Sequence, residues 1–138
     1  MPSVVFLCVA NSARSQMAEG LARASAPAGW DVHSAGSRPA RLSSRAVAAM
    51  QEIGIDISAQ YSKGMDQVPL AEADWVITLC AEEECPVAYT SGTRLDWSMP
   101  DPAAPAPSEE DERAQFRAAR DAIKAKLDAF WREAAAQA

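Results

Sequence analysis

The sequence lacks the features that would mark a membrane, secreted or polyanion-binding protein. None of its apolar runs reaches the roughly 18 residues needed to span a bilayer, and Met1, Pro2 and Ser3 do not form a basic region ahead of an apolar core, so no signal peptide is predicted. Basic residues are outnumbered, because 13 Lys and Arg against 19 Asp and Glu give a formal charge of −6. This balance disfavours a nucleic-acid surface. We therefore expect a cytoplasmic protein that binds neither membranes nor nucleic acids.

Cysteine and histidine are also scarce, with three Cys and one His in the chain. An odd number of Cys residues in an intracellular protein is a poor disulfide framework and favours reactive thiols, although small buried Cys residues are the common alternative. A zinc site would need His33 beside Cys8, Cys80 and Cys85, and their spacing matches no zinc template. We expect no metal site from these residues.

Short apolar segments alternate along the chain with segments of helical periodicity. Strands are predicted at residues 4–7, 30–35, 73–79 and 93–97, and the polar character of the last is typical of a strand near an edge. Helical spacing follows the first strand, follows Ser43 or Ser44, and runs from Ser108 to Phe130. Such alternation indicates parallel βαβ units. We expect a single domain over residues 1–138, an α/β three-layer sandwich with a four-stranded parallel sheet.

Three chemically capable residues follow strands of this predicted sheet. Cys8 and Cys80 each come directly after a buried strand, and Asp101 lies in the loop after the fourth strand. In open parallel sheets the ligand site lies at the carboxyl ends of the strands. We therefore expect these residues to meet at one edge of the sheet.

Residues 8–15 link the first strand to the first helix and have the composition of an anion-binding loop. Inward-pointing loop amides form a nest for an oxyanion, and the start of the helix adds partial positive charge. Arg14, six residues after Cys8, can close over the anion with two parallel donors, while the same field favours the Cys8 thiolate. Asn11 tolerates a left-handed backbone, and Ser15 can donate to the thiolate. The alternative is an ordinary turn with a buried Cys and a surface Arg.

Two features outside the loop add to this chemistry. Cys80 and Cys85 are separated by four residues, so they can close a disulfide at little entropic cost, although an inert pair of loop thiols is the alternative. Asp101 stands between two prolines, where it can protonate a leaving oxygen or simply form an Asx turn ahead of Pro102.

Several short motifs spread over nearly the whole chain, to about Phe130, belong together. They are Cys8-x5-Arg14-Ser15 with Gln16-Met17-Ala18-Glu19-Gly20, Ser34-Ala35-Gly36, Ile77-Thr78-Leu79-Cys80, Cys85-Pro86 and Trp97-x3-Asp101-Pro102-Ala103. This set resembles the low-molecular-weight protein tyrosine phosphatase family, and within it the thioredoxin-coupled arsenate reductases. Gln16, where the phosphatases usually have Pro, and the two extra Cys residues favour the reductases. Ala103 and Ala104 do so as well, because phosphotyrosine pockets tend to have aromatic residues there.

The resemblance implies a phosphatase-like fold and the reduction of arsenate to arsenite by a three-thiol relay, an arsenic detoxification reaction. Cys8 attacks the bound arsenate with Asp101 as the acid, Cys80 then attacks Cys8, and Cys85 attacks Cys80. Thioredoxin is the expected electron donor, and no tightly bound cofactor is implied. The residues implied to bind arsenate, or phosphate and sulfate as its mimics, are Val9, Ala10, Asn11, Ser12, Ala13, Arg14 and Ser15.

Two other functions could use the same residues. A low-molecular-weight protein tyrosine phosphatase would use Cys8, Arg14 and Asp101, with the extra thiols protecting Cys8 from oxidation. A non-catalytic thiol sensor would bind arsenite without turnover. Both remain alternatives to the reductase.

The family also binds a potassium ion near the loop, through groups that match Asn11, Glu19 and Ser34. The remaining carboxylate of that site falls at Lys63 in this sequence, so we expect the Lys63 ammonium to replace the cation. The alternative is a solvent-exposed loop Lys. We expect the protein to be a monomer.

Overall fold

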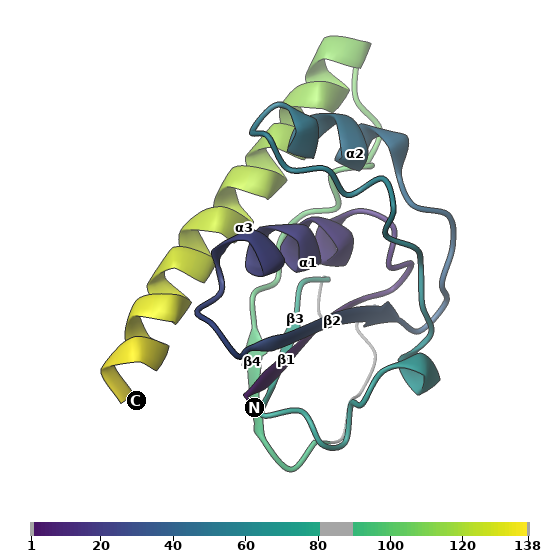
Figure 1. Cartoon of the computed structure of the whole chain (residues 1–138). Helices are drawn as coiled ribbons and strands as arrows, with labels where there is room; N and C mark the ends of the chain where they lie inside the picture. Colours follow the sequence, from purple (N-terminus) through teal and green to yellow (C-terminus); the bar gives the residue numbers. More distant parts are fainter. Residues whose placement is uncertain (1, 81–89, 138) are drawn as a thin grey trace.

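A four-stranded parallel sheet forms the centre of the protein, as predicted. The computed structural model describes residues 2–80 and 90–137, and the sheet order is β2-β1-β3-β4 (Figure 1). The strands are β1 (Ser3–Cys8), β2 (Asp31–Gly36), β3 (Trp75–Thr78) and β4 (Thr93–Asp96). From β1 the chain first adds β2 on one side, and then crosses to the other side of β1 to form β3 and β4. The order therefore switches between the neighbouring strands β1 and β3. Such a switch point opens a crevice at the carboxyl ends of the strands.

The helices α1 (Arg14–Ser25), α2 (Ser44–Gln51) and α3 (Glu109–Gln137) pack together against one face of this sheet (Figure 1). Val4 and Phe6 of β1 face this layer, while Val5 and Leu7 face the opposite side. There, the described covering residues include Val68 and the segment around the short 3-10 turn η1 (Met65–Gln67). Apolar side chains on both faces explain why the β1 sequence is a continuous hydrophobic run.

The helix boundaries follow from local sequence signals. Ser43 caps α2 because its Oγ accepts a hydrogen bond from the Ala46 amide at 3.3 Å. Gly54, just beyond that helix, has a positive φ of 79°, which suits a residue without Cβ. At the start of α3, Ser108 Oγ accepts from the Asp111 amide at 3.1 Å, as the capping pattern predicts.

The apolar face of α3 packs against α1 and α2 and reaches the sheet at β3. Its buried side chains include all four that the helical spacing predicts, namely Phe116, Ile123, Leu127 and Phe130. Phe130 contacts the rings of Trp75 and Trp97, with centroid distances of 5.1 and 6.0 Å. These contacts lock the far end of α3 to β3 and to the segment after β4. Among the described residues, no helix is long and apolar enough to cross a membrane.

Candidate active site

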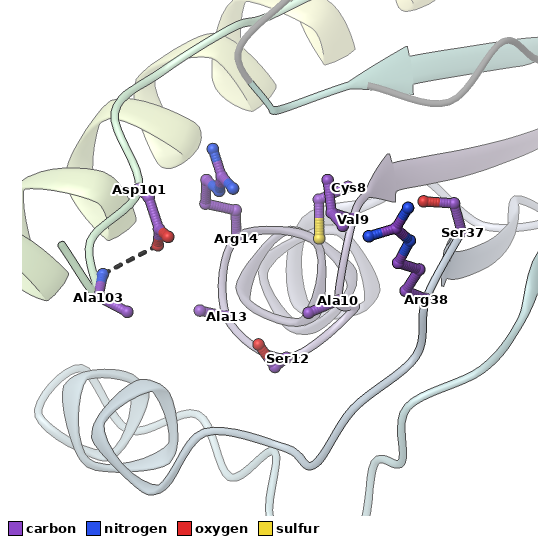
Figure 2. A pocket seen from close by; sticks show the side chains of 10 residues that line it. All are labelled: Cys8, Val9, Ala10, Ser12, Ala13, Arg14, Ser37, Arg38, Asp101 and Ala103. Carbon is purple, nitrogen blue, oxygen red and sulfur yellow. Dashed lines mark hydrogen bonds between the residues drawn. The ribbon is translucent and has the colours of Figure 1, made fainter. Parts of the chain in front are cut away.

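A pocket of about 520 Å³ opens at the carboxyl end of β1. Figure 2 shows Cys8 between Arg14 and Asp101 on one side and Arg38 on the other. The predicted meeting of Cys8 and Asp101 at one edge of the sheet is therefore confirmed, and Arg14 lines the same pocket. Cys80, the third residue of that prediction, is not part of the pocket lining. The residues that line the pocket are Cys8, Val9, Ala10, Ser12, Ala13, Arg14, Ser37, Arg38, Asp101 and Ala103.

The loop between β1 and α1 is held by the segment that follows β2. The amides of Arg38, Ala40 and Ser43 each donate at 2.9 Å to carbonyls of the loop, those of Val9, Ala10 and Ser12. Because N–H and C=O of one peptide unit point in opposite directions, this anchoring turns loop amides toward the pocket. Asn11 has the left-handed backbone that the sequence predicts, with a φ of 50°. The geometry is that of an oxyanion nest.

The thiol of Cys8 is free, only 3% exposed, and 2.8 Å from Ser15 Oγ. The surrounding bonds fix the direction of this contact. Ser15 Oγ accepts from Asn11 Nδ2 at 2.7 Å, so its own proton is left for the sulfur. Asn11 Nδ2 also donates to Ser34 Oγ at 3.0 Å, and Ser34 in turn donates to Glu19 Oε1 at 2.6 Å. Ser15 is thus placed to stabilise negative charge on Cys8, as predicted.

Arg14 is buried at the first position of α1. One terminal nitrogen of its guanidinium donates to Met99 O at 3.0 Å and to Leu79 O at 3.4 Å. These two carbonyls hold the group between the end of β3 and the loop that carries Asp101. Since a guanidinium has five N–H donors, several remain for a ligand in the pocket.

Asp101 forms an Asx turn and also lines the pocket, while its role as an acid stays a prediction. Its Oδ1 accepts a hydrogen bond from the Ala103 amide at 2.9 Å, which is the Asx turn expected before Pro102. The residue nevertheless lines the pocket, on the same side as Arg14 in Figure 2. The turn therefore fixes the carboxyl group at the site. Ala103 beside it is a small side chain that supplies no aromatic wall.

Cys80 is fully buried, and its sulfur is disulfide-bonded. Leu7 pairs with Thr78 in the sheet, and the Leu79 amide donates to Leu7 O at 2.9 Å. This register carries the chain to Cys80 alongside the end of β1, the strand that ends at Cys8. Cys85 lies outside the described residues.

A buried polar cluster lies beneath the loop, at the residues predicted for a cation site. Lys63 Nζ is 3.2 Å from Glu19 Oε1 and 3.0 Å from Tyr61 O, and Lys63 is only 8% exposed. The Lys63 amide also donates to Asn11 Oδ1 at 2.8 Å. The alternative interpretation of Lys63 as a solvent-exposed loop residue is therefore wrong. In the part of the chain that the structure describes, no group of three or more His, Cys, Asp or Glu residues could hold a metal ion.

The sequence did not assign a structural role in the site to Gln16, Ser37 or Arg38, although Gln16 is among the residues that carry the family resemblance. Gln16 is fully buried and donates to Asn11 Oδ1 at 2.9 Å and to Tyr61 O at 2.9 Å, which ties the loop to the segment around Lys63. Ser37 and Arg38 line the pocket. Their position directly after β2, at the carboxyl edge of the sheet, was the signal that could have revealed them.

Comparisons with known proteins agree with this geometry. The family model for low molecular weight phosphotyrosine protein phosphatase matches residues 3–138. An arsenate reductase of Halalkalibacterium halodurans is 43% identical over 129 residues, which cover 92% of this chain and 93% of that protein. A solved arsenate reductase in the phosphate binding state has a TM-score of 0.82 at 32% identity and covers 96% of this chain and 98% of its own. A Corynebacterium glutamicum thioredoxin-dependent arsenate reductase has a TM-score of 0.78 at 26% identity, and the match covers 100% of this chain and 64% of that one.

Proposed function

Because the chain belongs to the low molecular weight phosphotyrosine protein phosphatase family, we propose that it reduces arsenate to arsenite with electrons from thioredoxin. The observation that carries this proposal is a free Cys8 in an oxyanion pocket with Cys80 at the end of the neighbouring strand. The similar arsenate reductase of Halalkalibacterium halodurans supports the reaction, and the thioredoxin-dependent enzyme of Corynebacterium glutamicum supports the reductant.

Binding depends on the loop and on Arg14. A tetrahedral oxyanion accepts hydrogen bonds from the loop amides, and the guanidinium of Arg14 binds two of its oxygens in parallel. Arsenate, phosphate and sulfate share this shape, so phosphate and sulfate are expected to compete. The loop binds the anion with the arsenic atom above Cys8 Sγ.

The first chemical step forms a bond between Cys8 and arsenic. The Cys8 thiolate attacks the arsenic atom and one As–O bond breaks, while Asp101 gives a proton to the departing oxygen, which leaves as water. Ser15 stabilises the thiolate before the attack through its hydrogen bond to Sγ. Arsenic remains in its oxidised state at this point.

The electrons move in the second step. The Cys80 thiolate attacks Cys8 Sγ, the S–As bond breaks with both electrons kept by arsenic, and arsenite leaves as the Cys8–Cys80 disulfide forms. Cys85 then attacks Cys80 and releases Cys8 as a thiolate. A free Cys8 with a disulfide-bonded Cys80 fits the protein after this step. The dithiol of thioredoxin reduces the remaining disulfide and restores all three thiols.

A coupled assay tests the reaction. Purified protein with thioredoxin, thioredoxin reductase and NADPH should consume NADPH when arsenate is added, and phosphate should inhibit competitively. Steady hydrolysis of an aryl phosphate by a variant with Cys80 and Cys85 replaced by Ser, without arsenate-dependent NADPH oxidation by the wild type, would favour the phosphatase. Arsenite binding with neither activity would favour the sensor.

We further propose that the Lys63 ammonium occupies the position of a potassium ion. It is buried against Glu19, where a cation held by Glu19, Asn11 and Ser34 would sit. The wild type is therefore expected to have the same thermal stability and activity in KCl as in NaCl. Lys63→Ala removes the ammonium that pairs with the Glu19 carboxylate, so the melting temperature of this variant should fall. KCl should restore part of the lost thermal stability, whereas LiCl should not. Steep activation of the wild type by potassium, unchanged in Lys63→Ala, would reject this substitution.

The proposed chemistry also favours a location in the cytoplasm. Thiols that must be regenerated as thiolates are kept reduced in the cytoplasm, where thioredoxin operates. We also propose that the protein is a monomer. Size-exclusion chromatography with light scattering should give a mass close to 14.7 kDa.

A further inference from the structure

Arg38 forms the wall of the pocket opposite Asp101. Figure 2 shows its side chain reaching toward Cys8 from the segment after β2, whereas Arg14 and Asp101 lie on the other side of the sulfur. Its amide donates to Val9 O at 2.9 Å, and Pro39 follows it. Because the amide is bonded to the loop and proline restricts the residue before it, the backbone of Arg38 is fixed next to the oxyanion nest.

Within residues 2–80 and 90–137, the side chain of Arg38 has no partner. Neither an ion pair nor a side-chain hydrogen bond of Arg38 occurs with the described residues, whereas Arg23 pairs with Glu19 and Arg45 pairs with Glu112. The Arg14 guanidinium is different again, because one of its nitrogens is committed to two carbonyls. The chain as a whole has a net charge of −6, so the guanidinium of Arg38 gives the pocket wall a local positive charge.

We propose that Arg38 is a further substrate-binding residue, which holds the oxygens of a doubly charged tetrahedral oxyanion that face away from Arg14. The proposal rests on the proposed function for the identity of the substrate, and on the pocket alone for the class of ligand. A contact of this kind is present both in the bound substrate and in the transition state. Its loss therefore raises KM and leaves kcat nearly unchanged.

The test compares Arg38→Ala and Arg38→Lys with Arg41→Ala. Arg41 is exposed in the same connecting segment and lies outside the pocket, so its replacement removes the same charge without removing the contact. Inorganic phosphate is the probe, and the readout is protection of Cys8 from alkylation by iodoacetamide, followed by mass spectrometry of the Cys8 peptide. A second readout is KM for arsenate beside KM for thioredoxin.

Arg38→Ala should weaken phosphate protection and raise KM for arsenate by about tenfold, the cost of one charge-assisted contact. Arg38→Lys should recover part of the loss, while Arg41→Ala and KM for thioredoxin should stay within about twofold of the wild type. A change below twofold in Arg38→Ala, an equal loss in Arg41→Ala, or no protection of the wild type by phosphate would overturn the proposal. Phosphate protection that depends on Arg38 in a protein without arsenate turnover would instead contradict only the proposed reaction.

Discussion

Ser15 is the side chain with the most direct influence on the nucleophile. Its hydroxyl lies 2.8 Å from Cys8 Sγ, and its oxygen accepts a hydrogen bond from Asn11 Nδ2 at 2.7 Å. The donor direction thus depends on Asn11, a residue that is not part of the pocket lining. Ser34 and Glu19 extend the same chain of hydrogen bonds into the interior. A nucleophile supported in this way keeps its geometry before substrate arrives.

Ser15→Ala removes the donor to Cys8 and leaves Asn11 Nδ2 with one acceptor fewer. The rate of Cys8 alkylation by iodoacetamide at neutral pH should fall by about tenfold, because one hydrogen bond to a charged group is lost. Mass spectrometry of the Cys8 peptide measures the rate. Ser44→Ala is the control, since Ser44 lies in α2 outside this network. An unchanged rate in Ser15→Ala would show that Ser15 does not act on the thiolate.

At the scale of elements, the end of β2 holds the loop that follows β1. A Cβ on Gly36 would lie 2.4 Å from Val9 O and 2.9 Å from Asn11 N, so only glycine allows this approach of two backbones. A change at the end of β2 is therefore expected to move the loop between β1 and α1. The amide ladder from Arg38 to Ser43 continues the same contact.

Gly36→Ala should push the loop at Val9 and Asn11 away from the end of β2 and lower the free energy of unfolding by about 2–3 kcal/mol. It should also weaken phosphate protection of Cys8, because the loop amides move. Urea unfolding measures the first effect. Gly29→Ala is a useful comparison, since Gly29 has a φ of 91° with open space around it and should cost only about 1 kcal/mol of backbone strain. Wild-type stability and phosphate protection in Gly36→Ala would contradict the account of the loop.

Helices α2 and α3 are joined by a cluster of ion pairs around Glu52. Its carboxylate oxygens lie 2.8 Å from nitrogens of Arg117 and of Arg120. Hydrogen bonds from Arg117, and then from Arg120, lower the pKa of Glu52 from 4.5 to about 2. Since the folded-state pKa is depressed, this stabilisation is complete above the unfolded value of 4.5 and is lost as pH falls toward 2. Exposure of the pair to solvent keeps the effect small and sensitive to salt.

Glu52→Gln should therefore lower the melting temperature at neutral pH, and the difference from the wild type should shrink at pH values approaching 2 and in high salt. Thermal unfolding followed by circular dichroism across this pH range measures the difference. Glu72→Gln, at an exposed residue outside this cluster, should leave the melting temperature unchanged. A wild-type advantage that grows as the solution is acidified would contradict the assignment.

At the scale of the whole molecule, the sequence predicts what depends on local pattern. Continuous apolar runs predict the strands, and the carboxyl-end rule correctly brings Asp101 to Cys8 although the two are far apart in the sequence. Contacts between side chains from distant elements could not be predicted in this way. The Glu52–Arg117 pair and the bond from Gln16 to Tyr61 depend on distances that no periodicity encodes. Arg38 was missed for a different reason: its position directly after β2 indicates the carboxyl edge of the sheet, but residue type alone does not distinguish a pocket Arg from a surface Arg.

Across the whole fold, two cysteines from neighbouring strands come to the same edge of the sheet. Cys8 ends β1, and the register of β3 carries Cys80 to the same edge. In the proposed relay, Cys80, which is fully buried, has to change its position to attack Cys8. This movement is the step by which the relay differs from a phosphatase, which needs only Cys8, Arg14 and Asp101.

Mass spectrometry of the disulfides formed in a single turnover tests this relay most directly. Reduced Cys85→Ser protein, mixed with excess arsenate and quenched with acid, should accumulate a Cys8–Cys80 disulfide and release one arsenite per protein. The wild type should accumulate a Cys80–Cys85 disulfide with Cys8 free. Arsenite release from Cys85→Ser without any Cys8–Cys80 linkage, or repeated turnover by that variant with thioredoxin at the wild-type rate, would contradict the three-thiol mechanism.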